Sequence, residues 1–294
     1  MTMAPTSSAD LLGLARDAGR GIDEVFTTTP FMKAVAQIEQ DNGPEQRSRM
    51  LREMLRDLAA ENRDKIDSLN YPESVHGMIH TEFDRIEKQC DEKEDDWFDL
   101  ERFSLRCDFR NLCFGRVPVG PQHLEIGGLP KSLLVRGGIA QAFRFLNTSR
   151  RAGGVEPFYV LHLACNIWPP AFRLVYSHEA QLNMFRLLAE CMEMNPQVRG
   201  VQSCGWLFDP QLDTASPKLA YLRKDWIDNG GKLFRWQIDE ATTRMATKNS
   251  PHRQALYDEG KFRPYSHMVV FARPALLAWA QQNPPNDSTA ESTA

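Results

Sequence analysis

Hydrophobic and polar residues recur with a helical period along the first third of the chain. Five buried-type side chains repeat at i, i+1, i+4, i+5 and i+8 between Pro44 and Leu69: Met50, Leu51, Met54, Leu55 and Leu58. The residue before Pro72 is disfavoured in a helix, so this helix is expected to end near Asn70. Further helices are predicted over residues 9–26, 31–39 and 73–90. The pattern therefore predicts an all-helical N-terminal portion over residues 9–96, after a flexible leader at 1–8.

The pattern changes after Trp97. A period of two at the start of Phe103–Phe114 predicts a strand, and the apolar run Phe158–Cys165 predicts a central strand. Residues 117–128 are expected to form a glycine- and proline-rich bend. Further strands are predicted over residues 132–136, 172–176, 201–208, 233–238 and 265–271, and helices over 139–151, 177–193, 217–229, 251–259 and 273–282. This alternation predicts an α/β body, a mixed sheet flanked by helices, over 97–282, followed by a disordered tail at 283–294.

Charge and cysteine content narrow the class of protein. A net charge of −4 and a pI near 6.0 argue against a nucleic-acid partner. No apolar run approaches the roughly 18 residues of a membrane span, and the N-terminus has no apolar secretory segment. The six cysteines contain no C-x-x-C pair and are expected to be buried free thiols in the cytoplasm. We therefore expect a cytoplasmic protein without a nucleic-acid or membrane partner, and the composition leaves a homo-oligomer open.

The segment Ser250–Ala280 is cationic and aromatic in an acidic chain. Arg253 and Tyr257 are four residues apart on one helical face, while Tyr265 and His267 share one face of a strand. Arginine grips carboxylates and phosphates through paired N–H groups. We expect these residues, with Arg273, to form a pocket for an anionic or amino-acid-like small molecule, in which His267 is a candidate base. The alternatives are surface arginines paired with neighbouring acids and a hydrogen-bonded core histidine.

Two further segments place polar residues in or beside predicted strands. His162 lies within FYVLHLA and is a candidate proton carrier, because the pKa of histidine is near neutrality. Trp206 and Asp209 lie in GWLFDP at the end of a strand, a common ligand-binding position in α/β sheets. Trp206 is a candidate substrate-binding wall and Asp209 a candidate catalytic acid or base. A core histidine, a core tryptophan and a turn-capping aspartate are the structural alternatives.

Acidic and metal-ligand patterns are sparser. Glu125 and His123 lie in QHLEIGG, and Glu125 is a candidate catalytic carboxylate unless the segment is a solvated loop. His76 and His80 have helical metal-ligand spacing, but no Cys/His cluster completes a four-ligand set. No metal is therefore predicted.

The stretch SLLVRGGIAQAFRFLNTSRRAGGVEPFYVLHLA, residues 132–164, resembles the cofactor-binding unit of the acyl-CoA N-acyltransferase superfamily. Its glycine spacing is one residue shorter than the family's. The resemblance implies that Arg136, Gly137 and Gly138 offer backbone N–H groups to the pyrophosphate of acyl-CoA at a helix N-terminus. A plain strand–helix–strand connection is the alternative.

These observations favour a small-molecule biosynthetic enzyme. The resemblance implies N-acyl transfer, in which His162 or His267 would deprotonate the amine of an amino-acid-like acceptor and Arg253 or Arg273 would hold its carboxylate. One alternative is a condensation or cyclisation enzyme with Glu125 or Asp209 as the base. Another is a non-catalytic ligand-binding or protein-interaction protein whose N-terminal helices present a partner surface.

Overall fold

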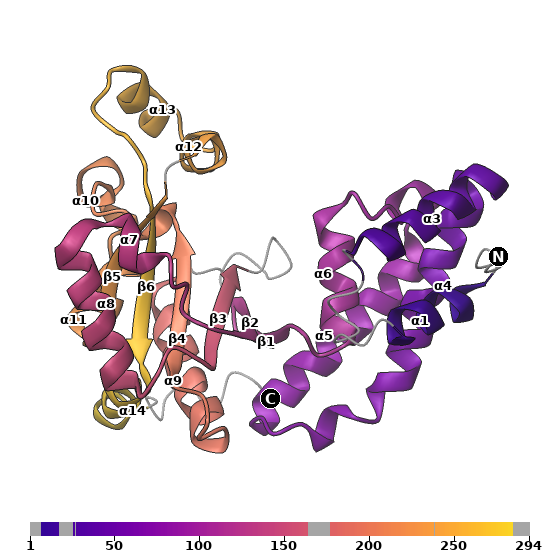
Figure 1. Cartoon of the computed structure of the whole chain (residues 1–294), viewed down its shortest axis with the longest axis horizontal. Coiled ribbons are helices and arrows are strands. Elements are labelled where there is room, and N and C mark those ends of the chain that lie inside the picture. The colour runs from indigo at the N-terminus through magenta and orange to yellow at the C-terminus, as the bar shows by residue number, and fades with distance from the viewer. Residues whose placement is uncertain (1–6, 18–25, 27, 164–176, 238, 285–294) are drawn as a thin grey trace. The chain divides into compact units, whose positions relative to one another are not determined.

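The chain combines α-helices with a mixed β-sheet, as the sequence predicts, and helices make up its N-terminal part (Figure 1). The computed structural model describes residues 7–17, 26, 28–163, 177–237 and 239–284. The chain divides into two compact units, Met1–Pro118 and Val119–Ala294, which are described separately. The division lies later in the chain than the expected boundary at residue 96.

Amphipathic helices build the first unit. They are α1 (Ser8–Asp17), α3 (Thr29–Asn42), α4 (Pro44–Arg63), α5 (Glu73–Glu92) and α6 (Phe103–Leu112), with short 3-10 turns η1 (Ile66–Ser68) and η2 (Asp95–Trp97). The face of α4 that the sequence pattern marked as apolar is buried, as is the face of α5 that carries Val75, Ile79, Phe83 and Ile86. The predictions for α3 and α5 are confirmed, while the helix predicted to reach Leu69 ends at Arg63 and is followed by η1. The helix expected over 9–26 is described only as far as Asp17, because residues 18–25 lie outside the described residues.

The strand predicted over Phe103–Phe114 is wrong, since this segment forms helix α6. Its alternation conceals a second period: Leu105, Phe109 and Leu112 are spaced i, i+4 and i+7 and are all buried. The residue that alternation placed inward first, Phe103, is exposed instead. The helical arrangement also buries Asp108, which the sequence pattern had placed on the polar face.

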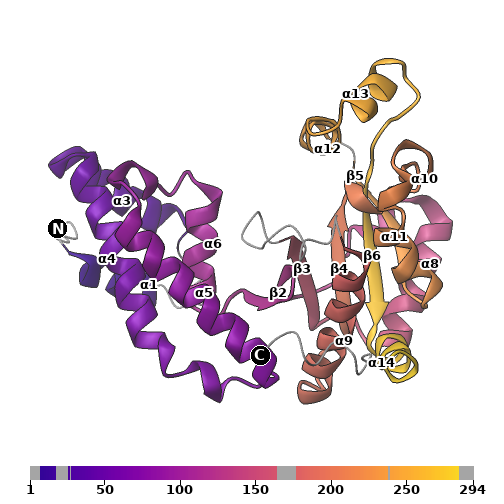
Figure 2. The same ribbon diagram turned by 180° about the vertical axis from the view of Figure 1, so that it is seen from behind.

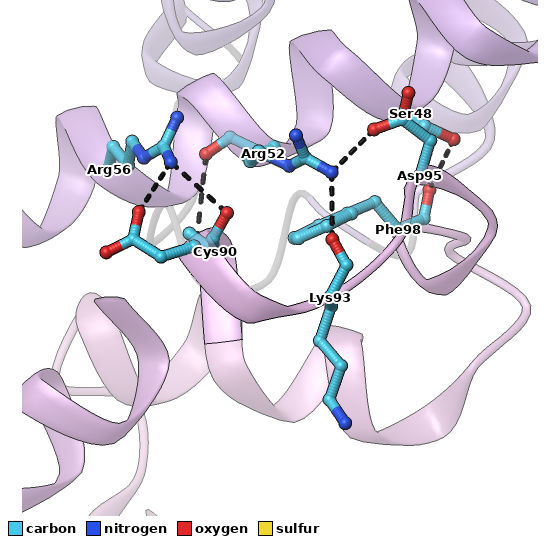
Figure 3. A network of polar contacts seen from close by, with 8 residues as sticks. Ser48, Arg52, Arg56, Cys90, Lys93, Asp95 and Phe98 are labelled. Carbon is cyan, nitrogen blue, oxygen red and sulfur yellow. Dashed lines mark hydrogen bonds and ion pairs between the residues drawn. The ribbon is translucent and has the colours of Figure 1, made fainter. Parts of the chain in front are cut away.

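Arginines of α4 attach the end of α5 and the turn η2 (Figure 3). Arg52 donates to the backbone carbonyl of Lys93 at 3.0 Å and to Asp95, and its guanidinium lies 4.6 Å from the centre of the Phe98 ring. One turn further on, Arg56 donates to the carbonyl of Cys90 at 3.2 Å. These bonds satisfy carbonyls at the C-terminal end of α5 that have no partner within the helix.

The second unit is organised around a six-stranded sheet in the order β1-β2-β3-β4-β6-β5 (Figures 1 and 2). Its strands are β1 (Val117–Val119), at the division between the units, β2 (Gln122–Gly127), β3 (Phe158–Leu163), β4 (Gly200–Gly205), β5 (Lys232–Gln237) and β6 (Ser266–Ala272). Strand β3 runs parallel to β4, whereas β2–β3, β4–β6 and β5–β6 are antiparallel.

Helices and short turns connect these strands. They are α7 (Leu133–Arg136), α8 (Gly138–Ala152), α9 (His178–Met194), η4 (Trp206–Phe208), α10 (Leu212–Ala215), η5 (Pro217–Leu219), α11 (Tyr221–Asp228), α12 (Glu240–Thr247), α13 (Pro251–Asp258) and α14 (Arg273–Gln282). On one face of the sheet, α7 and α8 pack Leu133 and Phe145 against Phe158, Phe234 and Met268. On the other face, Phe185 of α9 and Trp226 of α11 meet the ring of Phe271. Both faces of the centre of the sheet are therefore covered.

Local signals fix most boundaries in this unit. Ser177 caps α9 by accepting a hydrogen bond from the backbone N–H of Ala180 at 3.1 Å, and Gly153 ends α8 in the left-handed conformation. The predicted helices at α8, α9 and α13 and the strands at β3, β5 and β6 are confirmed, with ends shifted by a few residues. The predicted strand 201–208 ends at Gly205 and continues as η4.

Two predictions between residues 117 and 136 are wrong. The expected bend over 117–128 contains strands β1 and β2, joined through Gly120, whose φ of +61° permits a tight turn. The expected strand over 132–136 is helix α7, in which Leu133 is buried against the sheet. The predicted strand over 172–176 lies outside the described residues, as do residues 285–294 of the expected tail and most of the leader.

Candidate functional site

Strands β3 and β4 stop pairing before either strand ends. Their parallel pairing covers Tyr159–Leu161 and Val201–Ser203. The last residues of β3 continue to pair with β2, and those of β4 with β6, while no pairing between the described parts of β3 and β4 extends further. The pairing between the described residues of the two strands stops at their carboxyl ends, and ligands bind at the carboxyl ends of strands in open α/β sheets.

The structure brings together two predicted catalytic residues at this end of β3. Because His123 of β2 lies opposite His162, both side chains and Glu125 are on the same face of the sheet. His162 Nε2 lies 2.9 Å from Glu125 Oε2, an ion-pair distance without hydrogen-bond alignment. The side chains are 34% and 23% exposed, while the two facing atoms are themselves buried. A carboxylate at Nε2 orients the ring and leaves Nδ1 to exchange a proton with a substrate.

Polar residues surround this pair on the same face of the sheet. His123 and Gln202 are both almost fully buried, and Gln202 donates to the backbone carbonyl of Gly128 at 2.9 Å. Gln202 of β4 lies opposite Val160 of the neighbouring strand β3. The sequence analysis missed Gln202, although a glutamine in the middle of the apolar strand GVQSC was the signal that could have identified it.

Asp209 and His267 also lie near each other, at the adjacent end of β4 and β6. Asp209 Oδ2 accepts a hydrogen bond from the backbone N–H of Tyr265 at 2.6 Å, and Oδ1 accepts one from Gln211 at 2.9 Å. Burial lowers the pKa of His267, although the nearby Asp209 carboxylate acts in the opposite direction. Burial thus favours the neutral form of His267. Asp209 attaches the turn after β4 to the start of β6. These two hydrogen bonds correspond to the structural alternative given above for Asp209, an aspartate that caps a turn.

Arg253 and Trp206, both predicted to bind substrate, are in contact. The Arg253 guanidinium lies 5.0 Å from the centre of the Trp206 ring, and the residue as a whole is 7% exposed. Its Nε donates to the carbonyl of Ala246 at 2.5 Å and its Nη1 to the Ser216 hydroxyl at 3.0 Å. Burial lowers the pKa of Arg253, and none of the described carboxylates lies within ion-pair distance of it. The expected alternative, a surface arginine paired with a nearby acid, does not describe Arg253.

The remaining residues of the predicted anion pocket have other contacts. Arg273 Nη1 donates to the backbone carbonyls of Met192, Asn195 and Val198 at the C-terminal end of α9. Tyr257 packs against the guanidinium of Arg263 at 4.7 Å, and Tyr265 lies under Arg235 at 3.9 Å. The five residues thus do not converge on one pocket, and Arg273 serves to cap a helix.

The glycine turn before α8 has a structural explanation. A Cβ atom on Gly137 would lie 2.3 Å from the Gln141 side chain, which hydrogen-bonds to both backbone groups of Arg235. Gly138 has a φ of +73°, which favours glycine. Arg136 donates to the carbonyl of Trp236 at 3.2 Å and covers its ring. The three residues predicted to bind a cofactor therefore fasten α7 and α8 to β5.

No group of three metal-ligating side chains that could hold an ion occurs in the described residues. His76 approaches the carbonyl of Leu69 at 3.0 Å and His80 approaches Asp67 at 3.2 Å, so each has a local partner. The described cysteines are free thiols. None of the helices in the described ranges has both the length and the apolar character needed to cross a membrane.

The chain was compared with family models, curated proteins and solved structures. No family model, curated protein or solved structure matches the chain.

Proposed function

We propose that the chain is a small-molecule biosynthetic enzyme that transfers an acyl group to the amine of an amino-acid-like or carboxylated acceptor. The observation that carries the proposal is the His162–Glu125 pair, 2.9 Å apart and with both side chains partly exposed, beside the strand ends where β3 and β4 stop pairing. An amine must lose a proton as it attacks an acyl carbonyl. His162 accepts this proton, and Glu125 orients the imidazole.

The ends of β3 and β4, beyond the residues that pair with each other, supply a binding mode for the donor. An extended ligand that carries amide groups can hydrogen-bond to exposed strand edges in the way a peptide extends a sheet. The arm of acyl-CoA is extended and carries two amides, so acyl-CoA is the donor that we propose. In this arrangement its thioester lies at the carboxyl ends of β3 and β4, next to His162. A cytoplasmic location, where acyl-CoA and reduced cysteines occur together, completes the proposal.

A condensation or cyclisation enzyme is the second candidate function, and the exposure of two carboxylates indicates which of them would be its base. Asp209 is 2% exposed and holds two backbone N–H groups, whereas the Glu125 side chain is 23% exposed. A carboxylate base in such an enzyme would therefore be Glu125. This candidate uses the same two side chains but requires no acyl donor.

The two reactions and the non-catalytic alternative differ in what they consume. The purified protein is incubated with a panel of acyl-CoAs and amino acids, and release of the coenzyme A thiol is followed together with the mass of the product. Acyl transfer predicts thiol release that requires both a donor and an amine, with a product heavier by the acyl group. Thermal stabilisation by ligands of the panel without any turnover would instead support a binding protein and contradict the proposal.

A further inference from the structure

A cavity of about 410 Å³ lies at the N-terminal end of α13, away from the paired ends of β2 and β3. Its wall includes residues 215–218 from the α10–η5 connection, together with Asn249, Ser250, His252 and Arg253. Ligand pockets for small molecules typically have volumes of about 300–1,000 Å³. The cavity is therefore large enough for a small metabolite or for the charged end of a larger one.

The charges around this cavity are unbalanced. Arg253, Lys218 and His252 line it, while none of the residues that form its wall is acidic. The closest candidates on α13 are occupied elsewhere, because Glu259 pairs with Lys261 at 2.7 Å and Asp258 accepts a hydrogen bond from Gln254. Among the described residues, no carboxylate lies within ion-pair distance of Arg253, Lys218 or His252.

Arg253 makes this imbalance costly. A buried charge is expensive unless an opposite charge and hydrogen bonds compensate it. The Arg253 guanidinium has five N–H donors, and its two hydrogen bonds to described groups, Ala246 O and Ser216 Oγ, leave three for another partner. The ring of Trp206 offsets part of the charge by a cation–π contact but accepts none of these donors.

We propose that this cavity binds the anionic group of a small molecule, a carboxylate or a phosphate, which Arg253 contacts from the buried side and Lys218 and His252 from the open side. Two neutral groups, the Ser216 hydroxyl and the Asn249 amide, line the same wall and complete the polar surface. Arg253 supplies the paired N–H geometry that carboxylate and phosphate oxygens accept. The site does not depend on the proposed acyl transfer, because it requires binding alone.

The test uses the intact protein and measures binding of phosphate, pyrophosphate and succinate by calorimetry, and thermal stabilisation against sodium chloride of the same ionic strength. Two variants alter the site: Arg253→Gln, and the double variant Lys218→Gln with His252→Gln. Arg253→Gln also loses the hydrogen bond to Ala246 and can fail to fold. The double variant changes only exposed side chains, so its anion affinity tests the proposal in that case. Arg263→Gln, an exposed arginine over Tyr257, is the matched control.

We expect at least one of these anions to stabilise the wild-type protein beyond the chloride control. Loss of charge-assisted hydrogen bonds should weaken its binding about tenfold or more in Arg253→Gln and measurably in the double variant, and leave Arg263→Gln unchanged. A preference for succinate would assign a carboxylate, and a preference for phosphate or pyrophosphate would assign a phosphoryl group. The proposal is overturned if no anion exceeds the chloride control, or if the affinity is the same in the wild type and the double variant.

Discussion

Two buried carboxylates in the first unit share one guanidinium, and the titration of one of them, Asp108, should be measurable. Arg85 donates to Glu82 through two nitrogens, at 2.9 and 2.7 Å, and to Asp108 Oδ1 at 2.5 Å. Asp108 and Glu82 are each 3% exposed. Burial raises the pKa of Asp108 to about 6, and Glu82 adds to the increase, while Arg85 opposes it. Folding therefore favours the protonated form of Asp108.

The sign and size of the effect follow from linkage. An aspartate whose pKa rises from 3.8 to about 6 on folding binds protons more tightly in the native state. Its contribution to stability is fully present below pH 3.8 and is lost as the pH rises through 6. At about 1.4 kcal/mol per pKa unit, the full loss, from well below pH 3.8 up to pH 7, is about 3 kcal/mol. Asp108→Asn keeps a neutral side chain of similar shape at every pH and should abolish this dependence.

Native-state hydrogen exchange of amides in α5 and α6 measures the effect within the first unit. Comparing variant and wild type at each pH cancels the intrinsic pH dependence of exchange. The stability of Asp108→Asn relative to wild type should rise by about 2–2.5 kcal/mol between pH 4 and pH 7. Asp96→Asn, which changes an exposed aspartate, is the control and should show no such trend. A relative stability that stays constant or falls with pH would refute the reasoning.

Two further predictions test the second unit. Gly200→Ala places a Cβ 2.5 Å from the Phe271 carbonyl, so urea unfolding should show a loss of about 1–3 kcal/mol in the free energy of unfolding. Gly77→Ala is the control, because it has open space in α5, and it should gain about 0.5–1 kcal/mol. Equal effects of the two substitutions would contradict the packing around Gly200. Arg273→Gln removes donors to three carbonyls and should lower the free energy of unfolding by about 1–3 kcal/mol in urea, without changing anion affinity. Weakened anion binding in a folded variant would contradict its helix-capping role.

The sequence was sufficient for elements whose signals are local. Ser177 marked the start of α9 and Gly153 the end of α8, because a cap and a left-handed residue are properties of a few adjacent residues. It failed where a short segment fits two periods, as at Phe103–Leu112, which is too brief for alternation to exclude a helix. It also failed at β1 and β2, where Pro118 and Pro121 concealed two short strands within an apparent bend.

For the candidate site, residue types could be predicted but their partners could not. Glu125 and His162 were each singled out from their own segments, yet their contact depends on the register of β2 against β3. Arg253 and Trp206 meet only because the turn after β4 and helix α13 fold onto each other. Lys218 of the proposed anion site was missed because nothing distinguishes it in the sequence from a surface lysine.

The central claim is that His162, oriented by Glu125, accepts the proton of an amine during acyl transfer. The most direct measurement is the acyl-CoA-dependent rate of His162→Gln and Glu125→Gln against wild type, with His80→Gln, which changes another histidine near a carboxylate, as the control. A general base contributes about 10²–10⁴-fold, so His162→Gln should lose at least about a hundredfold in rate, and Glu125→Gln should lose less. A rate in folded His162→Gln equal to that of wild type would contradict the account.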